Sequence, residues 1–168
     1  MHLYIIRHAD AVPLGEQGII EDEKRPLTEA GQQQCASLVK ALQRVGVNLD
    51  RLLTSPLVRA RQTAEGISQG WGGTPPPILV CDLLAPGSKK RNILERLREQ
   101  HVDSLGIIGH NPDLSELTAW LLGDKDAGLH LEKAGVACIE FDGIPGKSTG
   151  TLAWLVNPMW CDRLANQA

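Results

Sequence analysis

The sequence predicts an α/β fold, a three-layer sandwich in which a mostly parallel sheet has helices on both faces. Short apolar runs, typical of buried strands, alternate along the chain with segments whose apolar residues recur every three or four positions, as on one face of a helix. Stretches rich in proline and glycine separate the two kinds of segment. Because no repeat or linker interrupts this alternation, we expect one domain over residues 1–168.

The strands are expected at short apolar runs, which are residues 3–6, 51–54, 78–81, 105–108, 136–141 and 151–156. Segments with helical periodicity separate the earlier runs, which is typical of parallel strands. The turn-rich segment 143–150 joins the last two runs without a helix, so this pair is expected to be antiparallel.

Helices are expected after each of the first four strands. The first begins after Thr28, a good N-cap residue, and ends near Gly46. Ser55 and Asn111 are each followed by proline, which predicts that they cap the helices after the second and fourth strands. Residues 89–100 form the remaining helix.

The composition excludes several classes of function. The net charge of -3 and the isoelectric point of about 5.9 argue against a nucleic-acid-binding protein that relies on overall positive charge. No apolar run approaches the length of a membrane span or of a signal-peptide core, so we expect a cytoplasmic protein without membrane contact. The cysteines lack metal-ligand and disulfide spacing, which predicts reduced, buried thiols.

Three polar motifs directly follow predicted strands. They are Arg7-His8-Ala9-Asp10 after the first strand, the nine residues 55–63 after the second, and Gly109-His110 after the fourth. Because ligands bind at the carboxyl ends of parallel strands, we expect both imidazoles, Arg7 and Arg59 to share one pocket. Both histidines also precede loop-to-helix junctions, where backbone N–H groups favour anions.

These residue types suit phosphoryl transfer. An arginine grips two phosphate oxygens at once, and a neutral imidazole can attack phosphorus and carry the phosphoryl group covalently. A second imidazole can donate to the developing charge. Arginines that neutralise the phosphate make a metal unnecessary, and the chain contains no glycine-rich nucleotide-binding loop, so no cofactor is expected.

With these motifs the chain resembles the histidine phosphatase superfamily, the phosphoglycerate-mutase-like family. That family has Arg-His-Gly after its first strand, Ser-Pro-x-x-Arg-Ala-x-Gln-Thr after its second and a later Gly-His or Ser-His; residues 55–63 match the second motif throughout. The segment Arg25-Pro26-Leu27-Thr28 is similar to that of the short SixA-type phosphohistidine phosphatases. One position departs from the pattern: Ala9 replaces the usual glycine, and its methyl group is expected to crowd the phosphate or restrict the backbone.

The resemblance implies a role for each motif residue. His8 is the nucleophile, Arg7, Arg25 and Arg59 bind the phosphoryl oxygens, and His110 is the second histidine of the phosphate pocket. Arg25 as ordinary solvated surface and His110 as a helix-capping neighbour remain the alternatives. Thr63 either orients Arg59 or only packs.

The general acid is harder to place. Family members that cleave esters carry a glutamate after the third strand, where this chain has Asp82, a possible but shorter proton donor. A phosphohistidine needs a proton on its leaving imidazole much less than an ester needs one on its leaving alkoxide. The chain is also short, and residues 12–24 are the only sizeable candidate wall for a pocket.

We therefore expect a phosphohistidine phosphatase whose partner is a phosphohistidine-bearing protein. Two alternatives stay open. One is a small-molecule phosphomonoesterase of the same fold, which acts on a small phosphorylated substrate. The other is a weakly catalytic phosphoprotein-binding module, which Ala9 alone favours.

Overall fold

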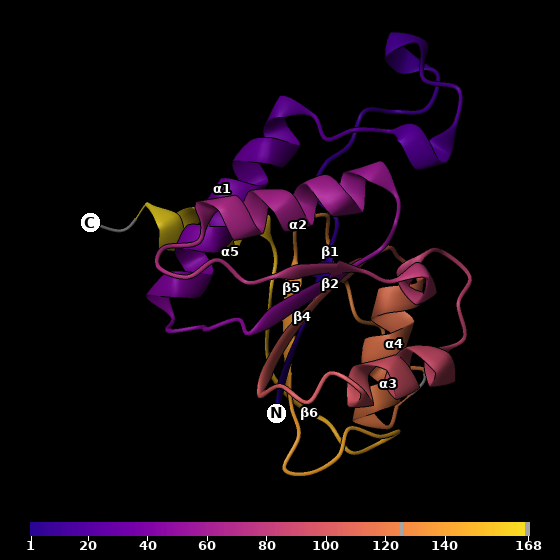
Figure 1. Cartoon of the computed structure of the whole chain (residues 1–168), viewed down its shortest axis with the longest axis vertical. Helices are drawn as coiled ribbons and strands as arrows, with labels where there is room; N and C mark the ends of the chain where they lie inside the picture. The colour runs from indigo at the N-terminus through magenta and orange to yellow at the C-terminus, as the bar shows by residue number, and fades with distance from the viewer. Residues whose placement is uncertain (125, 167–168) are drawn as a thin grey trace.

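The computed structural model describes residues 1–124 and 126–166 and contains a six-stranded sheet in the order β3-β2-β4-β1-β5-β6 (Figure 1). The strands are β1 (His2–Arg7), β2 (Arg51–Thr54), β3 (Ile78–Val80), β4 (Ser104–Gly109), β5 (Val136–Glu140) and β6 (Thr151–Val156). Strands β1 to β4 pair in parallel, whereas β5 pairs antiparallel with both β1 and β6. The expected mostly parallel sheet with an antiparallel closing pair is therefore confirmed.

Helices cover both faces of the sheet (Figure 1). One layer contains α1 (Glu29–Arg44), α2 (Val58–Gly70) and α5 (Pro158–Ala165), and the other contains α3 (Lys90–Arg98) and α4 (Asp113–Leu122). Alternate residues of β1 face opposite layers, since Tyr4 and Ile6 pack with the first group whereas Leu3 and Ile5 pack with the second. This confirms the three-layer prediction.

Two predicted helix starts are wrong by a few residues. Helix α2 begins at Val58 with Leu57 as its N-cap, and α4 begins after Pro112, so neither Ser55 nor Asn111 caps a helix. Both side chains are bonded elsewhere. The hydroxyl of Ser55 lies 2.9 Å from Nε2 of His110, and the amide of Asn111 donates to the carbonyl of Leu131.

Helix α5 was not expected from the sequence. It starts with Pro158 directly after Asn157, a local signal similar to those at Ser55 and Asn111. Only Cys161 and Ala165 of this helix are buried, so its apolar face is too narrow to stand out as a periodic pattern. Its position is decided by packing against α1.

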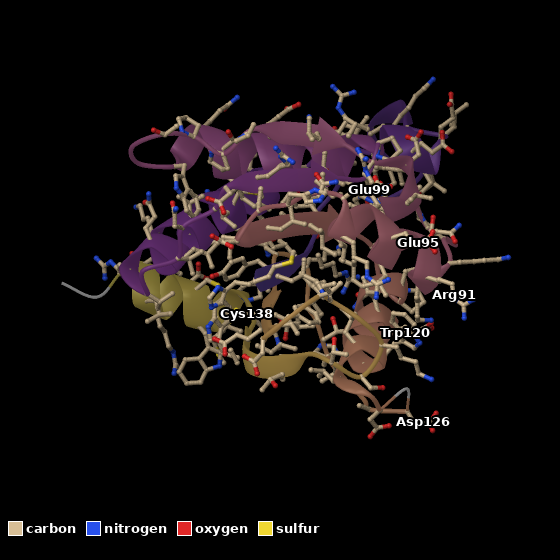
Figure 2. The ribbon with its side chains drawn as sticks, turned by 60° about the horizontal axis from the view of Figure 1, so that its bottom comes forward. Arg91, Glu95, Glu99, Trp120, Asp126 and Cys138 are labelled. Atoms are coloured by element: carbon tan, nitrogen blue, oxygen red, sulfur yellow. The ribbon has the colours of Figure 1, made fainter. Side chains whose placement is uncertain are left out.

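All four cysteines are free and buried. Burial raises the pKa of Cys35, Cys138 and Cys161 to about 11, so these thiols stay protonated at neutral pH. Figure 2 shows Cys138 in the interior, whereas Arg91, Glu95 and Glu99 lie along the outer side of α3. Among the residues that the structure describes, no helix has both the length and the apolar character to cross a membrane.

The carboxyl ends of three parallel strands meet at one edge of the sheet. Arg7 pairs with Gly109, and Thr54 with Ile108, so β1, β2 and β4 end at nearly the same level. The ladder continues one residue further, because the N–H of His8 donates to Gly109 and that of Ser55 donates to Ile108. The three motifs therefore leave the sheet side by side.

Candidate active site

Two histidines from distant parts of the chain stand next to each other at this edge. The ring centroids of His8 and His110 are 5.1 Å apart, and both side chains are almost fully buried. Ser55, the first residue after β2, holds the second imidazole by a contact of 2.9 Å between its Oγ and Nε2 of His110. Each of the three strand ends thus supplies one member of the group.

The tautomer of His8 follows from its two ring contacts. Nδ1 lies 2.7 Å from the carbonyl oxygen of Ala9, which can only accept, so Nδ1 carries the hydrogen. Nε2 lies 3.2 Å from Nε of Arg59, which can only donate, so Nε2 presents its lone pair. Both contacts select the same tautomer, in which Nε2 is the nucleophilic nitrogen.

Both imidazoles are neutral at physiological pH. Burial lowers the pKa of His8 from 6.5 to about 4; the hydrogen bond to Ala9 opposes this shift, and the charges of Arg59 and Arg7 add to it. Burial also lowers the pKa of His110 to about 3, with further contributions from His8 and Arg59. A neutral His8 retains the lone pair that attack on phosphorus requires.

Arg7 and Arg59 bring positive charge to the histidines. Nη1 of Arg7 donates to the carbonyl of Leu131 at 3.2 Å, while its Nε is buried without a hydrogen-bond partner among the described residues. Nδ1 of His110 is likewise buried and unpartnered within the described part of the chain. Such atoms are costly unless something satisfies them, and an oxyanion is a partner of suitable chemistry.

Arg25 is linked to this group through the carboxylate of Asp22. Its Nη1 donates to Oδ1 of Asp22 at 2.8 Å and its Nε donates to the carbonyl of Val12 at 2.6 Å. The other carboxylate oxygen of Asp22 accepts from Nη2 of Arg59 at 2.9 Å. Arg25 therefore neighbours Arg59 through Asp22. In the sequence Asp22 is only one of the acidic residues of the candidate wall, and its spacing of three residues from Arg25 is the signal that points to it.

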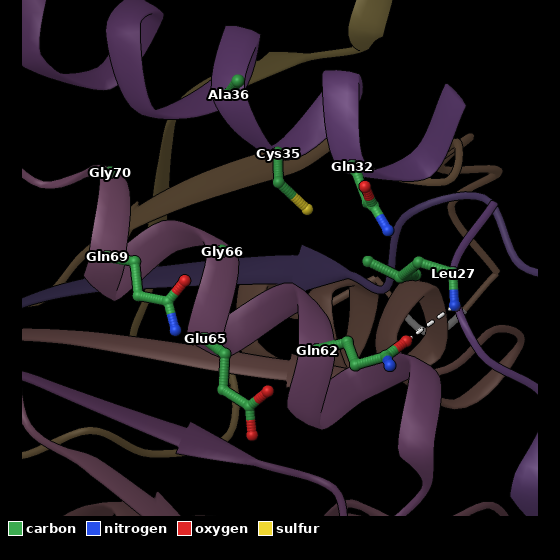
Figure 3. Close-up of a pocket in the computed structure, with 9 residues that line it drawn as sticks. All are labelled: Leu27, Gln32, Cys35, Ala36, Gln62, Glu65, Gly66, Gln69 and Gly70. Carbon is green, nitrogen blue, oxygen red and sulfur yellow. Dashed lines mark hydrogen bonds between the residues drawn. The ribbon is translucent and has the colours of Figure 1, made fainter. Parts of the chain in front are cut away.

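The last residues of the second motif hold the other motifs in place. Oγ1 of Thr63 accepts from the N–H of Ala9 at 3.0 Å and donates to the carbonyl of Arg59 at 2.7 Å. Oε1 of Gln62 accepts from the N–H of Leu27 at 2.7 Å, at one end of a groove of about 340 Å³ between α1 and α2 (Figure 3). Helix α2 thus fixes the backbone on both sides of the long loop.

Ala9 is accommodated without strain. It does not have a positive φ, so its backbone does not require glycine. Its side chain is fully buried in a small apolar cluster with Ala11, Leu27, Cys35 and Ala134. The expected restriction of the backbone at this position is therefore not seen.

Asp82 forms no hydrogen bond or ion pair with this group of residues. It is exposed and opens the short 3-10 helix η3 (Asp82–Leu84). The carbonyl of Leu84 packs against Gly109, where a Cβ would lie 3.2 Å from that oxygen, so η3 borders the residue before His110. No hydrogen bond or ion pair joins the Asp82 side chain to another described residue.

Across residues 1–124 and 126–166, no three His, Cys, Asp or Glu side chains lie close enough together to hold a metal ion.

Two neutral imidazoles lie beside the buried Arg59 and the half-buried Arg7, an arrangement whose chemistry suits phosphoryl transfer. The comparisons agree, because residues 3–85 match the Histidine phosphatase superfamily (branch 1). The chain is also 34% identical, over 95% of its length and 98% of the other, to an uncharacterized protein of Picosynechococcus sp.. The chain belongs to the histidine phosphatase superfamily and is a hydrolase of that family.

Solved structures of this family share the fold over nearly the whole chain. The protein histidine phosphatase SixA, solved with tungstate, superposes with a TM-score of 0.81 at 26% identity and covers 95% of this chain and 98% of its own. The alpha-ribazole phosphatase of Shigella flexneri has a TM-score of 0.71 at 19% identity, over 94% and 97% of the two chains, which shows the fold alone. The phosphoglycerate-mutase-like fold is thereby confirmed.

A mutase relative matches only in part. The protein named probable phosphoglycerate mutase GpmB of Cronobacter sakazakii is 28% identical over 62% of this chain, but the match covers 44% of that protein. This chain thus spans less than half the length of the mutase relative.

Proposed function

We propose that the chain is a phosphohistidine phosphatase that acts on a phosphorylated cytoplasmic protein through a phosphohistidine intermediate on His8. The observation that carries the proposal is the state of His8: its Nε2 is unprotonated and lies 3.2 Å from an arginine donor. Similarity to SixA at 26% identity supports the substrate class. One domain over residues 1–168 is proposed to carry the activity.

The proposed reaction has two displacements at phosphorus. In the first, Nε2 of His8 forms a bond to phosphorus while the bond from phosphorus to the substrate imidazole breaks. In the second, the oxygen of water forms a bond to phosphorus while the bond from phosphorus to Nε2 of His8 breaks. The electron pair returns to Nε2, and the protons of the water leave with inorganic phosphate. Arg7, Arg59 and His110 stabilise the charge on the transferring oxygens in both steps, and Arg25 binds the same group from the loop side.

The environment of Asp82 favours a phosphoramidate substrate over an ester. Asp82 is exposed, and no described residue forms a hydrogen bond or an ion pair with its carboxylate. An alkoxide leaving group requires a well-placed proton donor, whereas an imidazole leaves without one much more readily. The alternative, a small-molecule phosphomonoesterase of the same fold, is distinguished by a direct comparison of the two substrate classes.

The test compares substrates and traps the intermediate. Purified protein is assayed on a phosphohistidine peptide and on several phosphomonoesters, including a sugar phosphate. We expect the peptide to be the better substrate by kcat/KM. Faster hydrolysis of the sugar phosphate would instead support the phosphomonoesterase, and binding without turnover of any substrate would support the phosphoprotein-binding module.

The variant His8→Ala should lose turnover and the covalent adduct, and the control His2→Ala should retain both. His2 is the matched control because it is an exposed histidine at the other end of β1. The trapped adduct should be labile in acid and stable in base, as expected for a phosphorylated imidazole. A base-labile adduct, or a His8→Ala variant with near-normal turnover, would contradict the mechanism.

A further inference from the structure

Asp22 contacts both Arg59 and Arg25 through three separate acceptor atoms. Its main-chain oxygen accepts from Nη1 of Arg59 at 2.7 Å, its Oδ2 from Nη2 of Arg59 at 2.9 Å, and its Oδ1 from Nη1 of Arg25 at 2.8 Å. The two contacts to Arg59 engage both terminal nitrogens of its planar guanidinium. Such a paired contact fixes the orientation of the plane as well as its position.

The orientation of Arg59 matters because the third nitrogen of the same plane faces His8. Nε of Arg59 lies 3.2 Å from Nε2 of His8, so a rotation that broke the Asp22 contacts would also move the donor at the nucleophile. Three of the five N–H donors of Arg59 are engaged, by Asp22 twice and by His8 once, and the remaining two stay available for an anion.

The same carboxylate also fixes the position of the Arg25 guanidinium. The guanidinium of Arg25 is held between Oδ1 of Asp22 and the carbonyl of Val12, so the loop supplies both of its acceptors. Its neighbours Glu21 and Glu23 contact neither arginine; Glu21 pairs with Lys24 instead. Although desolvation opposes it, the hydrogen bond from Arg25 and the charge of Arg59 lower the pKa of Asp22, so it is ionised at neutral pH.

We propose that Asp22 is a positioning residue, which through its paired contacts presents Arg59 and Arg25 together to the phosphoryl group. This inference rests on the proposed phosphatase function and adds a residue to it. Asp22 acts through the arginines and does not touch the reacting atoms. The loop of residues 12–24 therefore has a catalytic purpose beyond forming a wall.

If Asp22 acted only through its charge, removing it would change phosphate binding in the opposite direction. A carboxylate near an anion site repels phosphate, and its removal should tighten phosphate binding if charge alone mattered. A positioning role predicts weaker binding and a lower kcat after removal, because Arg59 loses its fixed orientation. The sign of the change thus separates the two roles.

The experiment compares Asp22→Ala and Asp22→Asn with the control Glu23→Gln. Glu23 neighbours Asp22 in the 3-10 helix η2 (Asp22–Lys24), carries the same charge and makes no ion pair with a described residue. Turnover is measured on p-nitrophenyl phosphate and phosphoramidate, and tungstate binding is measured by calorimetry. We expect kcat to fall about 10- to 100-fold in Asp22→Ala with weaker tungstate binding, less in Asp22→Asn, and no change in Glu23→Gln.

A double-mutant cycle with Arg59→Ala separates positioning from a general structural role. If Asp22 acts mainly through Arg59, Asp22→Ala should cost far less activity in the Arg59→Ala background than in the parent. Additive losses, or tighter tungstate binding by Asp22→Ala, would overturn the inference. A parent protein that turns over neither substrate overturns the proposed function instead, and its tungstate binding still reports on Asp22. If Asp22→Ala does not fold, Asp22→Asn carries the same comparisons.

Discussion

Nε of Arg59 and Nε2 of His8 lie 3.2 Å apart, although 51 residues separate them in the sequence. A guanidinium N–H can only donate, so this contact exists only while Nε2 of His8 is unprotonated. The same contact lowers the pKa of the imidazole through the charge of the arginine. This contact and the hydrogen bond from Nδ1 to Ala9 therefore select the same tautomer of the proposed nucleophile, and burial is the largest cause of its neutral state.

The first prediction concerns the protonation of His8. Because its pKa is lowered from 6.5 to about 4, His8 should remain neutral, with its hydrogen on Nδ1, down to about pH 5. Nitrogen-15 chemical shifts of the histidine rings, followed over a pH titration, measure this directly. His2, which is exposed, serves as the internal reference. A His8 ring that titrates near pH 6.5 would contradict the prediction.

The second prediction concerns acid stability. The unfolded chain binds a proton on His8 below about pH 6.5, whereas the folded chain does so only near pH 4, so the folded state loses stability as the pH falls through this window. The loss from His8 is on the order of 3 kcal/mol when complete. Urea unfolding of the parent and of His8→Asn at pH 7 and pH 4.5 should give a smaller pH effect in the variant. Parallel curves for the two proteins would refute this.

The third prediction concerns Arg59. Arg59→Ala should lower kcat/KM at least about 100-fold, because it removes the guanidinium donors to the transferring group and the contact to His8. Arg59→Lys should restore little, since an ammonium cannot contact His8 and both acceptors of Asp22 in one plane. Arg61→Ala is the control, because Arg61 is exposed on the same helix. Equal effects at the two arginines would count against the assignment.

The fourth prediction concerns Thr63. Thr63→Val keeps the shape of the side chain but leaves the buried N–H of Ala9 without its acceptor. We expect the free energy of unfolding to fall by about 1–3 kcal/mol. Activity should fall with it, because Thr63 also bonds the carbonyl of Arg59. Thr63→Ser retains the hydroxyl and should lose much less. If Thr63→Val and Thr63→Ser show the same free energy of unfolding in chemical denaturation, the hydrogen bond is not the contribution of Thr63 to stability.

The fifth prediction separates the substrate classes through Asp82. In an ester-cleaving enzyme with Asp82 as the proton donor, Asp82→Asn should lower turnover of phosphomonoesters roughly 10²–10⁴-fold. We expect a mild effect on a phosphohistidine peptide, because its leaving imidazole needs the proton less. Both substrates are assayed with the same protein preparations. A large loss on the peptide would show that Asp82 is an essential acid and would remove the argument from leaving-group chemistry.

The local sequence predicted most of the fold. The strand over residues 51–54 has the bounds expected for it, and β1 and β4 each extend the expected run by one residue at either end. Thr28 caps α1 as expected, with its Oγ1 accepting from the N–H of Gly31. These features depend on apolar runs and capping residues, which act over a few positions. The caps at Ser55 and Asn111 were wrong, since α2 and α4 begin later; the hydroxyl of Ser55 contacts His110 and accepts from the N–H of Leu57, and the amide of Asn111 donates to Leu131.

The sequence by itself determined the alternation of the six strands with the first four helices, the three motifs at the strand ends and the residue types suited to phosphoryl transfer, because these depend on local patterns. Only the tertiary structure decided that Arg59 faces His8, that Thr63 bonds Ala9 and that Asp22 joins Arg59 to Arg25. Apart from the short-range contact between Asp22 and Arg25, each of these contacts joins segments whose separation in space depends on how whole elements pack. No local propensity encodes that distance, because it is set only when the sheet and both helix layers have assembled.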